Sequence, residues 1–191
     1  MIGMERGIVR LVPYQADWPA CFAAEAERLR QALGGRIGAV EHMGSTAIPG
    51  MPAKPIIDMA ASVESLAEAE GLIPDLARLG YEWHERDRQD VPDRLYFVRR
   101  TADGRATTHH LSLAEPASDF WARHLAFRDY LRTHPEAAAE YAELKRDLAR
   151  KFPTDRGAYV DGKEAFVKRI CDLALGRQRE RKADADERRS V

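Results

Sequence analysis

One stretch in the first third of the chain, residues 40–61 with the sequence VEHMGSTAIPGMPAKPIIDMAA, constrains the fold more than any other. Three prolines lie between its two apolar ends. Proline removes a backbone donor and forces the residue before it out of helical geometry. The stretch therefore cannot be one continuous helix or strand, and we predict two apolar strands, 37–43 and 55–62, joined by a shaped loop.

The loop carries groups that bind phosphate in other proteins. These are the backbone N–H groups of Gly44 and Ser45, the hydroxyls of Ser45 and Thr46, and the ammonium of Lys54. Asp58 follows in the second strand, where a magnesium ion could bridge a carboxylate and a phosphate. A Gly-Ser step alone is common in turns. The combination of strand, Gly-Ser, proline-rich loop, lysine, strand and aspartate is what predicts a phosphate site.

The composition narrows the class of protein and of ligand. With 191 residues, of which 45% are apolar and 32% charged, the chain fits one domain with a helical appendage, and no apolar run reaches membrane-spanning length. A formal net charge of −1 favours a small anionic ligand over nucleic acid. We expect a cytoplasmic protein that contacts no membrane. Cys21 and Cys171 are interpreted as buried thiols without a functional role, and the oligomeric state is left open.

The remaining pattern divides the chain into a mixed half and a helical half. We expect an α/β core over 1–115, a helical segment over 116–176 packed on it, and a charged, disordered tail over 177–191. Apolar spacing and turn signals predict helices at 18–33, 65–79 (weakened or kinked by Pro74), 119–133, 135–152 and 155–175, and further strands at 81–85, 95–100 and 106–113, the last two as an antiparallel hairpin.

Strand alternation places further polar residues near Asp58. Asp58 shares one strand face with Ala60, and His110 shares one face with Ser112. If the two strands are neighbours, Asp58 and His110 converge on the phosphate loop and form a small metal site. The alternative is that Asp58 is a hydrogen-bonded group that fixes the loop and that His110 is structural.

The helical half supplies cations. Arg128 lies on an apolar stripe, so its guanidinium must be paired or must face a ligand. Lys145 and Lys163 each follow a tyrosine by four residues; the alternative for these lysines is that their stems lie along the edge of the core with the charge in solvent. Arg94, at the head of a predicted strand, is a further cation near the site.

Several segments together resemble the GrpB family, which is similar to the nucleotidyltransferase superfamily. They are EHMGSTAIPGMPAKPIIDM, THHLSL, HLAFRDYLRTHPE, YAELKRDLARKFP and AYVDGKEAFV, and the resemblance runs from about residue 9 to 175. It implies a nucleotidyltransferase-like α/β fold, a small mixed sheet with flanking helices, followed by a C-terminal helical segment.

The superfamily also implies roles for particular positions. Its Gly-Ser pair holds a triphosphate and its first aspartate follows about a dozen residues later; here twelve residues separate Ser45 from Asp58. A second carboxylate two residues on would complete a pair of Mg²⁺ or Mn²⁺ sites, but this chain has Ala60. His110 takes the place of a later carboxylate, and Ser112 stands where many family members have a second histidine. Both departures argue against ordinary two-metal catalysis.

Three functions remain open at this point. The first is a metal-dependent nucleotidyltransferase acting on an unknown acceptor, the second a nucleotide- or phosphate-binding protein without transfer activity, and the third a scaffold that works through its helices. The sequence leaves open whether Glu41, Glu82, Glu85 or Asp87 replaces the missing carboxylate. The candidate catalytic and metal-binding residues are Asp58 and His110, and the candidate phosphate-binding residues are Gly44, Ser45, Thr46, Lys54, Arg94, Arg128 and Lys145.

Overall fold

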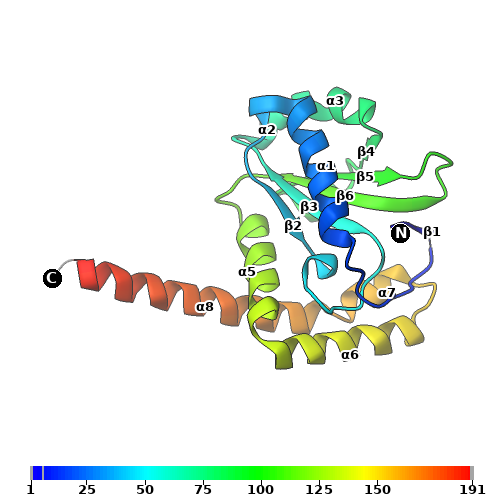
Figure 1. The fold of residues 1–191 in the computed structure, drawn as a ribbon. Helices are drawn as coiled ribbons and strands as arrows, with labels where there is room; N and C mark the ends of the chain where they lie inside the picture. The colour runs from blue at the N-terminus through cyan, green and yellow to red at the C-terminus, as the bar shows by residue number, and fades with distance from the viewer. Residues whose placement is uncertain (1, 6, 190–191) are drawn as a thin grey trace.

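A six-stranded sheet forms the centre of the protein, whose computed structural model describes residues 2–5 and 7–189. The strands follow the order β2, β3, β6, β5, β4, and β1 pairs with β6 (Figure 1). Their bounds are β1 Met4–Glu5, β2 Val40–Met43, β3 Ile57–Ser62, β4 Tyr81–Trp83, β5 Leu95–Arg100 and β6 Ala106–Ala114.

The pairing of the strands agrees with the pattern of the sequence. β2 pairs with β3, and β5 with β6, both antiparallel, which confirms the predicted neighbours and the predicted hairpin. β3 and β6 run parallel, and their register places Asp58 directly opposite His110 and Ala60 opposite Ser112. Because side chains alternate along a strand, these four residues lie on the same face of the sheet.

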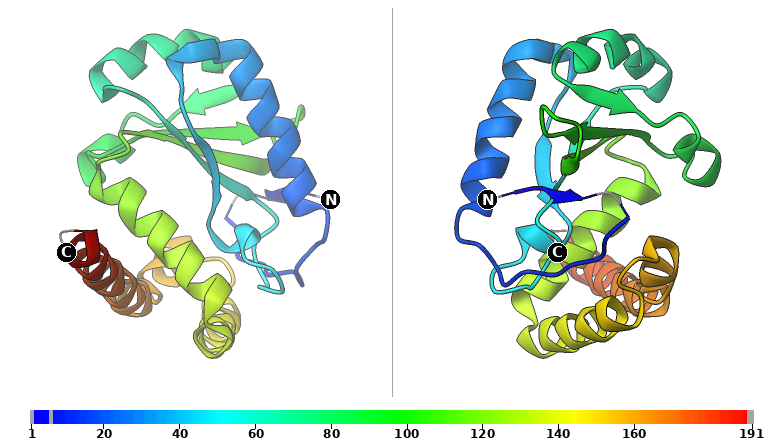
Figure 2. Two further views of the ribbon diagram at one scale, coloured as in Figure 1. Left: turned by 60° about the vertical axis from the view of Figure 1, so that its left-hand side comes forward. Right: turned by 90° about the vertical axis from the view of Figure 1, so that its right-hand side faces the viewer.

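Helices cover both faces of the sheet (Figure 2). The helices α1, α2 and α3 lie on one face, and the helices that follow β6 lie on the other, so the confirmed fold class is mixed α/β with flanking helices. On the first face are α1 Trp18–Leu33, α2 Leu66–Ala69 and α3 Ile73–Arg78, and on the second are α5 Asp119–Thr133, α6 Pro135–Lys151, α7 Arg156–Asp161 and α8 Glu164–Arg189.

The two faces of β3 have different partners. Ile57 and Met59, both fully buried, join the core cluster that includes Trp18 of α1. Ala60, on the opposite face, packs in a smaller cluster with Phe120 of α5. Asp58 shares the face of Ala60, so the packing of the core turns its carboxylate toward the C-terminal helices.

Two predicted helices are interrupted in the structure. The segment 65–79 is split into α2, a 3₁₀ turn at Glu70–Leu72 and α3, with Pro74 in the first turn of α3 where its missing N–H costs nothing. The segment 155–175 is split between α7 and α8. The polar loop after β4 contains a short helix, α4 Asp87–Asp90.

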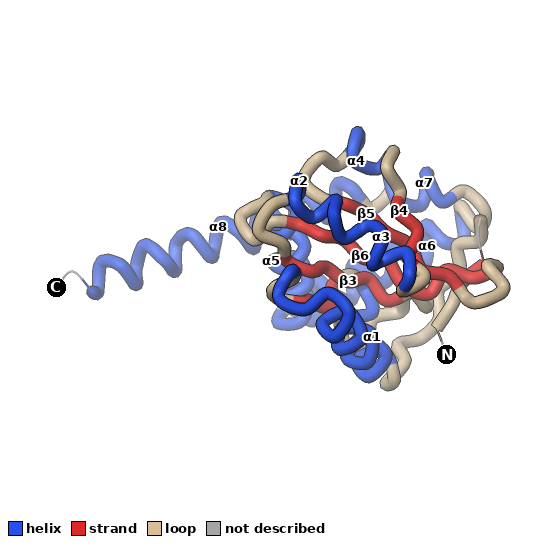
Figure 3. The backbone as a smooth tube through the Cα atoms, turned by 90° about the horizontal axis from the view of Figure 1, so that it is seen from above, coloured by secondary structure: helices blue, strands red, loops and turns tan. Residues whose placement is uncertain are grey.

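The last helix extends beyond the predicted end. α8 continues to Arg189, through 177–189, where the sequence predicts disorder, and it projects from the rest of the protein (Figure 3). This part contains five arginines and no proline, and its Arg, Glu, Ala, Gln and Lys residues have high helix propensity. Residues 190 and 191 of the predicted tail lie outside the described residues. Over the described residues, no helix has the length and apolarity needed to cross a bilayer.

A buried carboxylate joins α1 to the sheet. Glu25, 5% exposed, accepts hydrogen bonds from Arg28 Nη2 (2.7 Å), Tyr81 Oη (2.9 Å) and Arg99 Nη1 (2.7 Å). Burial disfavours the charge of Glu25, but the hydrogen bond from Arg28 and the charge of Arg99 outweigh it, so the pKa of Glu25 is lowered.

We predict that Glu25→Gln lowers the free energy of unfolding at pH 7 by about 1.5–3 kcal/mol, because hydrogen bonds to an ionised group are lost. A lowered folded-state pKa means that the stabilisation is complete above the ordinary glutamate pKa and is lost as pH falls through the folded value. Urea unfolding should therefore show the gap between wild type and variant closing below about pH 4. Glu27→Gln, which changes an exposed carboxylate on the same helix, is the control, and an equal effect of both variants would contradict the prediction.

Candidate functional site

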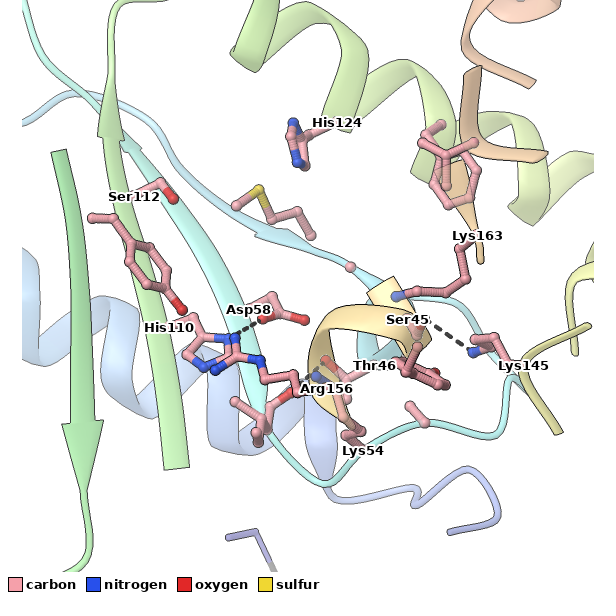
Figure 4. Close-up of a pocket in the computed structure, with 18 of the residues that line it drawn as sticks. Ser45, Thr46, Lys54, Asp58, His110, Ser112, His124, Lys145, Arg156 and Lys163 are labelled. Atoms are coloured by element: carbon pink, nitrogen blue, oxygen red, sulfur yellow. Dashed lines mark hydrogen bonds and ion pairs between the residues drawn. The ribbon is translucent and has the colours of Figure 1, made fainter. Parts of the chain in front are cut away.

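A cavity of about 320 Å³ opens between the β2–β3 loop and the C-terminal helices. Figure 4 shows its polar side chains converging from β3, β6, the loop and α6–α8. Its size is at the lower end of the range for small-molecule sites, roughly 300–1,000 Å³. The polar residues that line it are Ser45, Thr46, Lys54, Asp58, Asp87, Arg94, Tyr96, His110, Ser112, His124, Tyr141, Lys145, Arg156, Tyr159 and Lys163.

Gly44 lies at the closest approach of the loop to β3. Its φ is +70°, a backbone conformation that side chains disfavour. A Cβ at this position would be 2.9 Å from the Cβ of Asp58 and 3.0 Å from its Cγ, closer than real contacts allow. Both the positive φ and the short distance to Asp58 therefore require glycine at this position. Because glycine has no side chain, the loop can pack directly against Asp58.

Asp58 and His110 form the centre of the cavity. His110 Nδ1 lies 2.8 Å from Asp58 Oδ1 across the parallel strand pair. Burial of Asp58 acts against its ionised form, but the hydrogen bond and charge of His110 and the charge of Lys54 outweigh it, so the pKa of Asp58 is lowered. Asp58 is thus an ionised carboxylate at neutral pH, and 35% of its side chain remains exposed.

The 3₁₀ turn η2 (Ser45–Ala47) is held in place by buried hydrogen bonds. Thr46 Oγ1 donates to the carbonyl oxygen of Ile56 (3.4 Å) and lies 3.0 Å from His42 Nε2. Burial lowers the pKa of His42 to about 4, so this imidazole is neutral at pH 7. Thr46 therefore fixes the loop.

Ser45 lies against two residues of α6. Lys145 Nζ donates to Ser45 Oγ (3.0 Å) and to the carbonyl oxygen of Pro52 (2.5 Å), and Tyr141 also hydrogen-bonds to Ser45. Lys145 is only 1% exposed. Burial and the neighbouring charges of Lys163, Arg146 and Lys54 lower the pKa of Lys145 to about 6. Its amine is therefore mostly neutral at pH 7.

Three further cations line the cavity. Lys54 comes from the loop, Arg156 from α7 and Lys163 from the turn before α8. Burial, followed by the charge of Lys54, lowers the pKa of Lys163 to about 8. Burial raises the pKa of Tyr96, which hydrogen-bonds to Arg156, to about 12, so this phenol stays protonated.

Arg94 closes the side of the cavity near β5. Its Nε and Nη2 each donate to the carboxylate of Asp87 at 2.9 Å, and its Nη1 donates to Ser112 Oγ at 3.4 Å. The guanidinium also lies over the ring of Tyr96, 4.5 Å from its centroid. Arg94 is therefore held by an ion pair and an aromatic face at the edge of the cavity.

Arg128 lies elsewhere. Its guanidinium donates to Glu41 Oε2 (2.6 Å), to the carbonyl oxygen of His42 (2.9 Å) and to both oxygens of Asp129. It is not among the described residues that line the cavity. Of the two alternatives predicted for Arg128, the structure therefore shows the one in which the buried guanidinium is paired with protein groups. These contacts connect α5 to β2.

The structure brings together eight of the nine predicted site residues, all except Arg128. Sequence reasoning proposed no role in the site for Arg156 or Lys163. For Lys163 a signal existed, because Tyr141 with Lys145 and Tyr159 with Lys163 repeat the same spacing on successive helices. For Arg156 no pattern in the sequence pointed to the cavity.

The side chains in and around the cavity decide whether it can hold a divalent metal ion. Among the described residues there is no group of three or more His, Cys, Asp or Glu side chains arranged to hold a metal ion. Ala60 stands two residues after Asp58, and Glu41, opposite Ala60 on β2, is bound to Arg128. Glu82 lies on β4, which is separated from β3 by β6 and β5, and Asp87 is bound to Arg94. Asp58 alone fits a magnesium ion whose other ligands are phosphate oxygens and water.

The sheet and the Gly-Ser turn beside a strand aspartate define a nucleotidyltransferase-like fold. Cid1 poly(U) polymerase, in a crystal structure with MgGTP bound, aligns with a TM-score of 0.50 and 11% identity over 72% of this chain and 44% of that chain. At this identity the likeness shows the fold alone.

The chain belongs to the GrpB family, described as GrpB protein, which matches residues 8–173. A UPF0157 protein of Pseudomonas aeruginosa is 42% identical over 173 residues, which cover 90% of this chain and 69% of that protein. The crystal structure of conserved protein GrpB from Enterococcus faecalis aligns with a TM-score of 0.80 and 35% identity over 88% of this chain and 99% of that chain. The predicted family and fold class are confirmed.

We predict that Gly44→Ala destabilises the protein more than Gly50→Ala. Both glycines have a positive φ, which alanine disfavours, so the free energy of unfolding of both variants falls by about 1–2 kcal/mol. A Cβ at Gly50 meets no atom within 4 Å, whereas a Cβ at Gly44 meets Asp58, which adds about 1–3 kcal/mol of overpacking. Urea unfolding measures both values. Equal losses for the two variants would show that the close approach to Asp58 does not constrain the fold.

Proposed function

We propose that this protein binds a nucleoside triphosphate, or a similar phosphorylated small molecule, in the cavity between the β2–β3 loop and the C-terminal helices. The observation that carries the proposal is the imbalance of charge in the cavity lining. Four cationic side chains (Lys54, Arg94, Arg156, Lys163) line it together with two acidic ones (Asp58, Asp87), and Lys145 is a further basic group whose amine is mostly neutral at pH 7.

The acidic residues cannot satisfy these cations. Asp58 is bound by His110 and Asp87 by Arg94. Among the described residues, no carboxylate lies within ion-pair distance of Lys54, Lys145 or Lys163. The charges of Lys163 and Lys54 contribute to the lowered pKa of Lys145, and the charge of Lys54 contributes to the lowered pKa of Lys163. Crowding like charges in a partly buried cavity is unfavourable unless an anionic ligand compensates them. Phosphate groups carry the charge and the acceptor oxygens that such a cavity requires.

The fold supports a nucleotide as the phosphorylated ligand. The solved neighbour named above has MgGTP bound. In this chain, the Gly-Ser turn lies beside Asp58 of β3. In this chain a Mg²⁺ or Mn²⁺ ion would be held by Asp58 and by the phosphates of the ligand. His110 would orient Asp58 through its 2.8 Å hydrogen bond and is a poorer ligand for these oxygen-preferring ions.

Nucleotidyl transfer is the second candidate function. Asp58 on its strand beside the Gly-Ser turn favours it, and Ala60 in place of a second carboxylate disfavours two-metal catalysis. Binding without transfer is therefore the function that the geometry supports best.

Binding should appear as stabilisation of the folded protein. At a concentration one hundred times its dissociation constant, a triphosphate adds about 2.7 kcal/mol to the free energy of unfolding. We expect a thermal shift with at least one of the four common nucleoside triphosphates in the presence of Mg²⁺, and no shift with the matching nucleoside. Lys54→Met should weaken binding about tenfold or more, because a charge-assisted hydrogen bond is lost. A flat response to all triphosphates would contradict the proposal and favour a scaffold.

The pH dependence of triphosphate binding should show whether the charge of Lys163 contributes to the affinity. With a pKa of about 8, Lys163 gains charge as pH falls from 9 to 7, while phosphate remains mostly doubly ionised. Affinity measured by calorimetry should therefore rise as pH falls through this range. Lys163→Met should remove the dependence, and Lys168→Met, an exposed lysine of α8, should retain it. A dependence of the opposite sign in the wild type would contradict this assignment.

Release of pyrophosphate separates the two candidate functions. If transfer occurs, wild type with Mg²⁺ and a triphosphate releases pyrophosphate, and Asp58→Asn abolishes the release because the carboxylate that holds the ion is lost. We expect binding without release. Release above background that depends on Asp58 would make nucleotidyl transfer the function.

A further inference from the structure

The contact between Ser45 and Lys145 has the geometry of a nucleophile with its base. Ser45 Oγ lies 3.0 Å from Lys145 Nζ, within the range in which a proton passes from a hydroxyl to an amine. The second partner of Lys145 Nζ is a carbonyl oxygen, that of Pro52. In the structure Lys145 Nζ also donates to Ser45 Oγ. The neutral amine has a lone pair, and rotation of the Ser45 hydroxyl directs its proton to that lone pair while Nζ still donates to the carbonyl of Pro52. The pair therefore matches the serine–lysine variant of the nucleophile–base arrangement.

The surroundings of Lys145 favour the neutral amine that a base requires. The side chain is 1% exposed, and among the described residues no carboxylate lies within ion-pair distance of it. Its charged neighbours include Lys54, Arg146 and Lys163, all cations. Asp58 acts in the other direction but is bound to His110. An amine that simply neutralised phosphate would gain more from exposure to the cavity than from burial behind Ser45.

The position of Ser45 suits a nucleophile. β2 ends at Met43, Gly44 turns the chain with a φ of +70°, and η2 begins at Ser45. A sharp turn between a strand and a helix presents a serine hydroxyl to the cavity in other nucleophilic sites. The hydrogen bonds of Thr46 to Ile56 and His42 fix this turn. Figure 4 shows Ser45 between Lys145 and Lys163, with Lys54 nearby.

We propose that Ser45 is a covalent acceptor of the terminal phosphoryl group of a nucleoside triphosphate, with Lys145 as its general base. This proposal rests on the proposed function, because the triphosphate must occupy the cavity. The Ser45 Oγ–phosphorus bond forms, the bond from that phosphorus to the bridging oxygen breaks, and nucleoside diphosphate leaves with the electron pair. The hydroxyl proton passes to Lys145 Nζ, and Lys54 and Lys163 neutralise the charge on the transferring group.

The test uses the full chain with ATP labelled at the γ-phosphate, Mg²⁺ and peptide mapping after denaturation. We expect label on the peptide that contains Ser45, none from ATP labelled at the α-phosphate, and none in Ser45→Ala. Lys145→Met should lower the labelling rate about 10²- to 10⁴-fold, the usual contribution of a general base. Arg150→Met, an exposed change on the same helix, should label at the wild-type rate.

The pH profile of labelling gives a second readout that does not depend on a variant. The rate in the wild type should increase as pH rises through about 6, where Lys145 loses its proton. A rate that is flat over this range, or Lys145→Met labelling at the wild-type rate, would overturn the role of Lys145. If Lys145→Met does not fold, the pH profile of the wild type alone tests whether Lys145 is the base.

The thermal shift with ATP, measured on the same samples, separates this proposal from the one on which it rests. Stabilisation by ATP without label on Ser45 overturns the covalent step and leaves nucleotide binding intact. Absence of both stabilisation and label overturns both. Label at Ser45 from the α-phosphate alone overturns phosphoryl transfer, because the leaving group would then be pyrophosphate.

Discussion

The parallel register of β3 and β6 is the constraint on which the site depends. It sets Asp58 opposite His110 and fixes both on the face that the C-terminal helices cover. Gly44 then allows the β2–β3 loop to approach Asp58 more closely than any side chain would permit. A shift of one residue in β3 would turn Asp58 into the core that packs on α1, and a shift of one residue in β6 would turn His110 away from the cavity.

The C-terminal helices contribute basic side chains to the site. α6, α7 and the start of α8 bring Lys145, Arg156 and Lys163 to the loop that carries Ser45 and Lys54. The two acidic residues of the cavity are each engaged by a basic partner, so the lining has an excess of positive charge. This arrangement favours an anionic ligand even though the whole chain has a formal net charge of −1. The charges of the cavity lining, and not the net charge of the chain, therefore support the proposed anionic ligand.

The sequence predicted the parts of the site that follow from local rules. Alternation along strands predicted that Asp58 and His110 converge if their strands are neighbours, a condition that the structure meets, and proline and glycine signals located the loop. The sequence does not specify whether a buried cation pairs with a protein carboxylate or with a ligand. For this reason Arg128 is predicted to bind the ligand, whereas in the structure it binds Glu41 and Asp129. It also gave no sign of Arg156, because the approach of α7 to β3 depends on how the helices pack and not on any pattern within α7.

The most direct test of ligand binding in the cavity is a crystal structure of the protein with Mg²⁺ and a non-hydrolysable nucleoside triphosphate. We expect phosphate oxygens within hydrogen-bond distance of Ser45 Oγ, Lys54 Nζ and Lys163 Nζ, with the metal ion between Asp58 and the phosphates. A ligand bound elsewhere on the surface, or a cavity without ligand at a saturating concentration, would contradict this expectation.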